Sequence, residues 1–123
     1  IDGHGAYYYL TGSATWLVLA IVTQMFGIRG EWGNLCINPK LLKEQFDNNN
    51  EITLRMNFRN RKLTVLFINP DKKDYGRYGI KQVEINGKTP EMLSNKDNVC
   101  LIKADTFDIL TSETQNQMKV ILG

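Results

Sequence analysis

The residues best suited to chemistry are Thr11, Gly12 and Ser13, which stand directly before the first long apolar run of the chain. The first amide N–H groups of a helix have no partner within the helix and carry partial positive charge, so a helix that starts here can bind an anion. Thr11 adds a hydroxyl group, and Gly12 lets a ligand approach the backbone closely. The same residues also suit a plain helix cap, in which a hydroxyl oxygen accepts a backbone N–H. The local sequence leaves both interpretations open.

Other reactive side chains are few. His4 is the only histidine, and Cys36 and Cys100 are the only cysteines, which is below the ligand count of a zinc or iron–sulfur site. We therefore expect no metal and no cofactor. Ser13 with His4 makes a poor catalytic pair, and no two carboxylates have a spacing that forces them into one site. The two thiols could form one disulfide or stay reduced and buried, and the reduced state, common inside cells, favours the cytoplasm.

Length and charge narrow the function classes. The chain has 123 residues, of which 42% are hydrophobic, and a formal net charge of +2. This length suits one ordinary domain with a real core, and two full domains are not expected. The charged residues form no long run of one sign, so we expect neither nucleic acid nor an acidic membrane as a partner. The apolar run from Ala14 to Phe26 is shorter than the roughly twenty residues of a membrane span.

That apolar run predicts one buried α-helix. Its polar breaks are Thr15, Thr23 and Gln24, and a helix that is apolar nearly all round packs inside a larger structure. Gly27 can end it in the left-handed conformation. The glycine-rich stretch that follows, "GIRGEWGNLCINPKL", predicts a linking segment with short extended pieces.

Alternation of apolar and polar residues predicts strands in the rest of the chain. "EITLRMNF" and "KLTVLFI" alternate with period two on either side of a polar turn, which predicts an antiparallel hairpin. Asn86-Gly87 is a strong hairpin signal, and "NVCLIK" and "QMKVILG" add two short strands. The stretch from Asp105 to Gln117 carries no clear motif. The expected fold class is mainly β, an antiparallel two-layer β-sandwich.

The loop "NPDKKDYGRYG" contains the two tyrosines that could contact a sugar, Tyr75 and Tyr78. An exposed tyrosine can stack on a sugar ring, whereas most tyrosines beside a sheet pack on that sheet. The chain could therefore be a carbohydrate-binding module, or a purely structural one.

Several motifs occur in an order that resembles glycoside hydrolase family 94, the cellobiose and chitobiose phosphorylases and the related cyclic β-1,2-glucan synthases. The likeness covers about thirty-five residues and rests on Leu10-Thr11-Gly12-Ser13-Ala14 followed by Trp16, on Phe26-Gly27-Ile28-Arg29, and on Leu35 to Ile37 leading to Asn38-Pro39. The segments "KLTVLFINP" and "KVILG" are similar to the C-terminal β-domain of that family.

The resemblance implies a fold and an activity for a larger protein. Such proteins combine an N-terminal β-sandwich, a helical linker, an (α/α)6 barrel with the active site and a C-terminal β-domain. They cleave a β-glucoside with inorganic phosphate and invert the anomeric carbon, with a barrel aspartate as general acid. In this family a Thr-Gly pair at a barrel helix binds the phosphate, which implies that role for Thr11 and Gly12. Ser13 would cap the helix and could offer one more amide.

The same resemblance implies that this chain is a C-terminal fragment. Residues 1–30 would be the terminal helix segment of the barrel, and residues 31–123 the C-terminal β-sandwich. Asp2 and His4 do not match the family's acid or phosphate-pocket residues, so we expect no catalytic residue and no activity from the chain alone. The expected partners are a β-linked oligosaccharide and phosphate, through the parent enzyme. The apolar helix would contact the remainder of that enzyme or a second copy.

Overall fold

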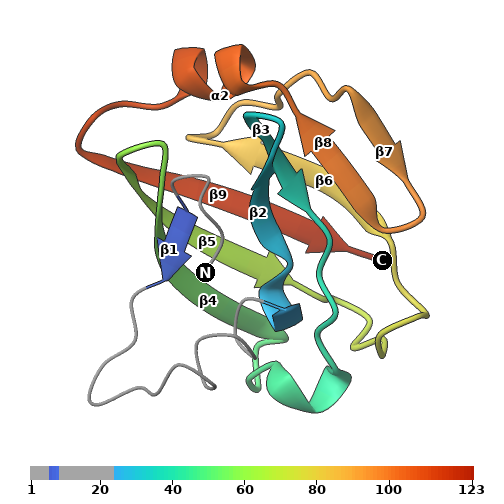
Figure 1. The fold of residues 1–123 in the computed structure, drawn as a ribbon. Helices are drawn as coiled ribbons and strands as arrows, with labels where there is room; N and C mark the ends of the chain where they lie inside the picture. Colours follow the sequence, from blue (N-terminus) through green and yellow to red (C-terminus); the bar gives the residue numbers. More distant parts are fainter. Residues whose placement is uncertain (1–5, 9–23) are drawn as a thin grey trace.

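The computed structural model describes residues 6–8 and 24–123, and these residues are mainly β (Figure 1). The larger sheet has the strand order β1 (Ala6–Tyr8), β4 (Glu51–Phe58), β5 (Arg61–Ile68), β9 (Gln115–Leu122) and β6 (Ile80–Ile85). The smaller sheet has the order β2 (Ile28–Glu31), β3 (Asn34–Ile37), β8 (Val99–Ile102) and β7 (Ser94–Lys96). A 3-10 helix at Lys43–Gln45 and the helix α2 (Ala104–Leu110) lie between strands.

The hairpin of β4 and β5 is confirmed as predicted. Its strands pair antiparallel from Glu51↔Ile68 to Phe58↔Arg61, and alternate side chains are buried because successive residues of a strand point to opposite faces. The two turn residues, Arg59 and Asn60, both have positive φ, 53° and 61°. A two-residue turn of this kind follows the right-handed twist of the strands that it joins.

The last strand corrects the expectation of an antiparallel fold. β9 lies between β5 and β6, and it pairs parallel with β5 from Lys62↔Gln115 to Ile68↔Ile121 and antiparallel with β6. The chain reaches β9 only after it has passed through β6, the smaller sheet and α2. Parallel strands need such a long connection. Patterns among neighbouring residues therefore do not predict the pairing of β5 with β9.

The Asn86-Gly87 turn forms, but the expected hairpin partner strand does not. Asn86 and Gly87 have φ of 50° and 82°, and Ile85 and Lys88 exchange backbone hydrogen bonds of 2.8 and 3.0 Å. The pairing ends at this single bridge. Pro90 comes two residues later and has no N–H to continue a ladder.

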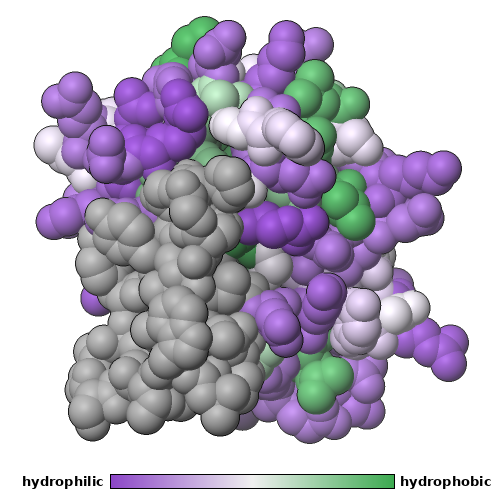
Figure 2. Space-filling view, viewed as in Figure 1, coloured by the Kyte–Doolittle hydropathy of each residue, from purple (hydrophilic) through white to green (hydrophobic). Residues whose placement is uncertain are grey.

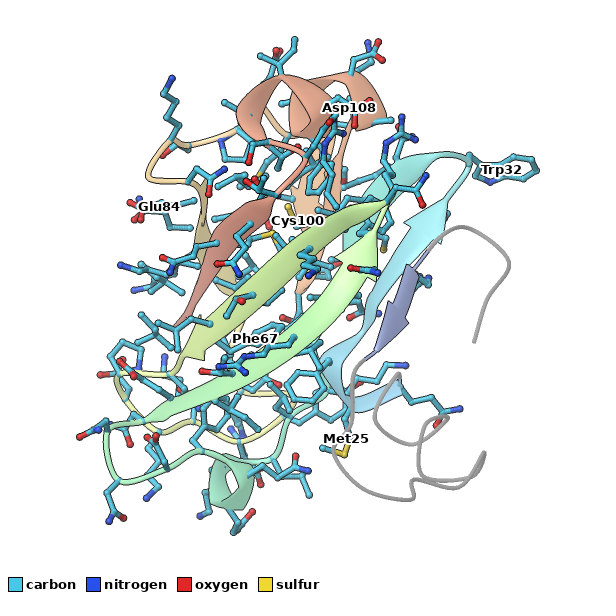
Figure 3. All side chains as sticks on the ribbon, turned by 90° about the vertical axis from the view of Figure 1, so that its left-hand side faces the viewer. Met25, Trp32, Phe67, Glu84, Cys100 and Asp108 are labelled. Atoms are coloured by element: carbon cyan, nitrogen blue, oxygen red, sulfur yellow. The ribbon has the colours of Figure 1, made fainter. Side chains whose placement is uncertain are left out.

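The expected linking segment is instead a hairpin of the smaller sheet. β2 and β3 pair from Ile28↔Ile37 to Glu31↔Asn34, and β3 continues into β8 through Leu35↔Ile102 and Ile37↔Cys100. The turn at Trp32-Gly33 has φ of 54° and 81°, and the Trp32 side chain projects from its tip (Figure 3). The boundary expected between residues 30 and 31 falls inside β2.

Both sheets contribute to one hydrophobic core, which gives the fold its sandwich-like form. The core side chains share near-complete burial and come from every strand of which side chains are described except β7, for example Ile28, Leu35, Met56, Phe67, Val83, Ile102 and Val120. On the face shown in Figure 2, the described residues are mostly hydrophilic, with apolar residues in separate spots. Large exposed apolar side chains such as Trp32, Leu93 and Ile109 stand at element ends and on α2.

α2 was not predicted from the sequence. It spans only seven residues, and its side chain Phe107 is buried and meets Phe58 edge to face at a centroid distance of 5.2 Å. No side chain of its own N-cap residue caps it. Instead the side-chain oxygen of Asn34 accepts the N–H of Ala104 at 3.3 Å. The helix therefore depends on contacts with β3 and β4 rather than on a local signal.

Of the expected apolar helix, the structure describes only the end. Residues 24–26 are helical, and Gly27 follows with φ +63°, as predicted for a left-handed helix end. A Cβ atom at Gly27 would collide with the backbone carbonyl oxygen of Asn38. The remainder of that helix lies outside the described residues.

Candidate functional site

The predicted phosphate-binding residues Thr11, Gly12 and Ser13 lie outside the described residues, but the chain on both sides of them is described. On the N-terminal side β1 pairs antiparallel with β4, with Ala6 opposite Phe58 and Tyr8 opposite Met56. Through this pairing the backbone just before residues 9–23 is part of the larger sheet.

The C-terminal flank of the segment is fastened more extensively. The Met25 carbonyl accepts the N–H of Lys40 at 2.8 Å, and the Gly27 carbonyl accepts the N–H of Asn38 at 2.9 Å. The Phe26 ring lies in the core, 5.6 Å from Phe67 between centroids. Figure 3 shows Met25 and Phe67 in the same lower part of the molecule. The sandwich thus holds both ends of the segment that carries the predicted site.

The two tyrosines proposed as sugar contacts have different environments, although they are three residues apart. Tyr78 is only 5% exposed, and its hydroxyl donates to the Leu41 carbonyl at 2.8 Å. Burial is the main cause that raises its pKa well above the ordinary value. Tyr75 is 48% exposed. Tyr78 is therefore part of the core, and Tyr75 is the tyrosine with a ring surface available to a ligand.

Two side chains give the loop between β5 and β6 its form. Asn69 is buried; its amide donates to the Lys73 carbonyl at 2.7 Å, and its oxygen accepts the Lys73 N–H at 3.0 Å. Asp74 accepts the N–H of Tyr75 at 3.0 Å and that of Lys43 at 3.1 Å. These bonds hold the backbone at Tyr75 against the rest of the domain.

A cleft of about 460 Å³ opens beside Tyr75. Three segments line it: the residue after β3, the loop between β5 and β6, and the β7–β8 hairpin with its turn, which Figure 1 shows near the same edge as that loop. We call the region around this cleft the cleft end of the sandwich. Its polar lining side chains are Asn38, Tyr75, Asn95, Asp97 and Asn98. Tyr78 lines the cleft as well, so both tyrosines that the sequence suggests as sugar contacts lie there, whereas the asparagines and Asp97 were not predicted.

The opposite end of the sandwich, which we call the helix end, contains α2 and the Arg59-Asn60 and Trp32-Gly33 turns. Asp108 of α2 accepts hydrogen bonds from Nε and Nη2 of Arg59 at 2.9 and 2.8 Å, and a further bond from Nη1 of Arg61. The hydrogen bonds from Arg59 are the first cause that lowers the pKa of the Asp108 carboxyl, and the charge of Arg61 adds to it. This cluster ties α2 to the β4–β5 turn.

A second, smaller hollow of about 290 Å³ lies over the outer face of the larger sheet. Thr53, Thr64, Glu84 and Lys119 line it, and Glu84 lies opposite Lys119 in the β6–β9 register. No aromatic side chain of the described part of the chain lines this hollow. Its surface offers a ligand no ring to stack on.

The two cysteines are free thiols in the core. Burial raises the pKa of the Cys100 thiol to about 11 and also raises that of Cys36, so both are protonated near neutral pH. Figure 3 places Cys100 in the interior. Among the described residues, no group of three or more His, Cys, Asp or Glu side chains could hold a metal ion.

Comparisons with known proteins add no family. Neither the models of known protein families nor the curated proteins contain a match to this chain. Within residues 6–8 and 24–123, no helix has the length and apolar character needed to cross a membrane. A functional proposal therefore depends on the residues and their arrangement.

Proposed function

We propose that the chain is the C-terminal part of an inverting glycoside phosphorylase of family 94, and that its β-sandwich holds a phosphate-binding segment in position. The observation that carries this proposal is the double attachment of residues 9–23. β1 pairs with β4 just before this segment. Just after the segment, Phe26 packs in the core against Phe67, and the carbonyls of Met25 and Gly27 accept backbone hydrogen bonds. Attachment on both sides would favour anion binding, because a site that is organised before binding loses less entropy when the anion binds.

The chemistry follows from this arrangement. Thr11 and Gly12, at the start of a helix contributed to an (α/α)6 barrel, would hold inorganic phosphate by a hydroxyl and by backbone N–H groups, and Ser13 would cap the helix. The phosphate is a co-substrate that attacks the anomeric carbon of a β-linked oligosaccharide, while an aspartate elsewhere in the barrel protonates the leaving oxygen. The sandwich itself is non-catalytic, and the reaction uses no metal.

The motif resemblance supports this proposal. Some of the residues on which the resemblance rests also have a structural role in the described part of the chain. Gly27 must be glycine, since a side chain there would collide with Asn38. Asn38-Pro39 ends β3 at the place where the chain turns toward the 3-10 helix. The apolar helix would contact the rest of the parent enzyme or a second copy. Two buried free thiols support a cytoplasmic setting.

The test uses the protein of the complete encoded reading frame, assayed with cellobiose, chitobiose or a β-1,2-glucan and phosphate. We expect an α-sugar 1-phosphate as product, and we expect the 123-residue chain alone to form none. Thr11→Val in the complete protein should raise the KM for phosphate by about tenfold, the size expected for one lost bond to a charged group. Thr53→Val, on the exposed face of β4, is the matched control and should leave this KM unchanged.

Two results would contradict the proposal. One is a reading frame that encodes no barrel upstream of Ile1. The other is a complete protein that releases sugar 1-phosphate with the same KM for phosphate in wild type and in Thr11→Val.

A second function, carbohydrate binding, is favoured by one specific observation, the cleft beside the exposed Tyr75. It does not compete with the first, because a non-catalytic domain of a glycan-processing enzyme can also bind glycan.

A further inference from the structure

The cleft beside Tyr75 has the size and the aromatic surface of a small-molecule site. Its volume of about 460 Å³ falls within the roughly 300–1,000 Å³ of ligand pockets. Tyr75 stands at the cleft with about half of its surface exposed, and Asp74 fixes its backbone. Tyr78, which also lines the cleft, is buried and bonded to the Leu41 carbonyl, so this part of the lining is held in place while the ring of Tyr75 remains accessible.

The polar lining has unused hydrogen-bonding capacity. Asn98 does not add to this capacity, because its amide donates to the Pro39 carbonyl at 2.7 Å and its side-chain oxygen is buried away from the cleft. The amide of Asn95 donates to the Ile80 carbonyl at 3.3 Å, which leaves its oxygen as an acceptor. Within the described residues, the side chains of Asn38 and Asp97 make no hydrogen bond or ion pair. Amide and carboxylate groups in this state can bind hydroxyl groups that both donate and accept.

The charge of the lining narrows the ligand class. Among the described residues that line the cleft, Asp97 is the only charged side chain, and none is Lys or Arg. A phosphorylated or carboxylated ligand would meet no cation there and one like charge. A neutral ligand with an apolar face and many hydroxyl groups fits the lining best, because the face can stack on Tyr75 and the hydroxyls can bond to the asparagines and Asp97.

We propose that this cleft binds a neutral oligosaccharide, with Tyr75 as the stacking ring and with Asn95 and Asp97 as hydrogen-bonding groups. The β7–β8 hairpin holds both groups in place, since Asn95 lies in β7, which pairs with β8, and Asp97 lies in the turn that joins them, with φ of 54°. The inference rests on the second proposed function, carbohydrate binding, and names its ligand class and binding residues, but it does not depend on the phosphorylase function. It concerns an added binding site at the cleft end, away from residues 11–13 in sequence.

Binding of cellotetraose, chitotetraose and maltotetraose to the 123-residue chain is measured by saturation-transfer NMR and by titration calorimetry. At least one probe should bind, with the strongest transfer at ring C–H protons of the sugar. Tyr75→Ala should weaken its binding by about tenfold through loss of the stacking surface. Tyr75→Phe keeps that surface and should bind within about twofold of wild type. Asn95→Ala should weaken binding by about threefold.

The matched control is Trp32→Ala, because Trp32 is another exposed aromatic residue, 92% exposed, at the helix end of the sandwich. It should not change binding. The inference is overturned if none of the three probes binds, if Tyr75→Ala and Asn95→Ala both bind as wild type does, or if Trp32→Ala abolishes binding. Binding of maltotetraose alone would uphold the cleft site and argue against a β-linked substrate for the parent enzyme, so the two proposals fail separately.

Discussion

The helix end and the cleft end of the sandwich both contain asparagines and aspartates, but the two ends use them differently. At the helix end Asn116 is buried and uses its full hydrogen-bonding capacity. Its amide donates to the Lys62 and Ser112 carbonyls at 3.1 and 2.9 Å, and its oxygen accepts from the Ser112 N–H and from Asn86 at 2.7 and 3.0 Å. Asp108 is likewise occupied, by Arg59 and Arg61.

At the cleft end the polar groups that line the cleft are only partly used. Asn98 and Asn95 each donate one hydrogen bond, and Asp97 is exposed in a turn. Saturated polar groups lock segments together, whereas unsaturated ones at an open cleft remain available to a ligand. Unpartnered polar atoms alone do not distinguish the ends, because Asn57 Oδ1 and Arg61 Nε beside the β4–β5 turn are also buried without a hydrogen-bond partner among the described residues. The comparison teaches that a polar side chain can serve in binding only where it is exposed beside a cleft, as Asn95 and Asp97 are.

The largest expected effect tests whether stability resides at the helix end. Phe107→Ala removes a buried ring that meets Phe58 edge to face, and it should lower the free energy of unfolding by about 3–5 kcal/mol. Ile109→Ala, on the exposed side of the same helix, and Asn95→Ala at the cleft end should each change it by less than about 0.5 kcal/mol. Urea unfolding followed by circular dichroism measures all three. Equal losses at Phe107 and Asn95 would erase the contrast between the two ends.

The second effect tests a tightly packed point near the cleft end, where Gly27 meets Asn38. Gly27→Ala adds a Cβ that collides with the Asn38 carbonyl oxygen at a positive φ, and it should lower the free energy of unfolding by about 2–4 kcal/mol. Gly76→Ala is the matched control, because Gly76 also has a positive φ, +91°, but open space around it. It should lower this free energy by only about 1–2 kcal/mol in the same urea titration. Indistinguishable values for the two variants would show that the close contact is unimportant.

The smallest effect concerns the ion pairs of the helix end. Asp108→Asn should lower the free energy of unfolding by about 1 kcal/mol at pH 7, since all three side chains keep contact with solvent. The folded pKa of Asp108 is lowered, so this contribution is complete above the unfolded pKa of about 3.9 and is lost as the pH falls through the lower folded value. Unfolding of wild type and variant between pH 7 and pH 2 should therefore converge at the acid end.

Asp105→Asn provides the control for that pH series, because Asp105 is exposed on the same helix and acts on Arg59 only through its charge. Its difference from wild type should stay below about 0.5 kcal/mol across the pH range. A constant gap between wild type and Asp108→Asn down to pH 2 would mean that packing, rather than charge, accounts for the effect.

The sequence was informative where partners are near neighbours. The β4–β5 hairpin was predicted because its alternation and its turn residues act over a few positions, and Gly27 was predicted to end a helix for the same reason. The parallel pairing of β5 with β9 brings Thr64 beside Gln117, and no local pattern encodes a contact between residues so far apart. α2 was not predicted, because its N-terminal cap comes from Asn34, which lies in β3 and is distant in sequence.

The candidate sites divide along the same line. Tyr75 and Tyr78 were equal candidates from the sequence, and only packing separated them, by placing one ring in the core and one beside the cleft. Asp97 and Asn98 are residue types that predict a turn from the local sequence. That they line the same cleft as Asn38 and Tyr75 depends on the tertiary structure. Thr11, Gly12 and Ser13 remain a prediction from motif and helix physics.

The sequence by itself determined the mainly β character and the positions of most strands and turns, because alternation and turn chemistry act between residues close in the chain. It also indicated the loop that contains Tyr75 as a candidate binding site. The tertiary structure decided which sheet each strand joined and that β2 and β3 are sheet rather than linker. It also decided which polar groups at the two ends kept free hydrogen-bonding capacity. These outcomes depend on burial and on partners brought together from distant parts of the chain.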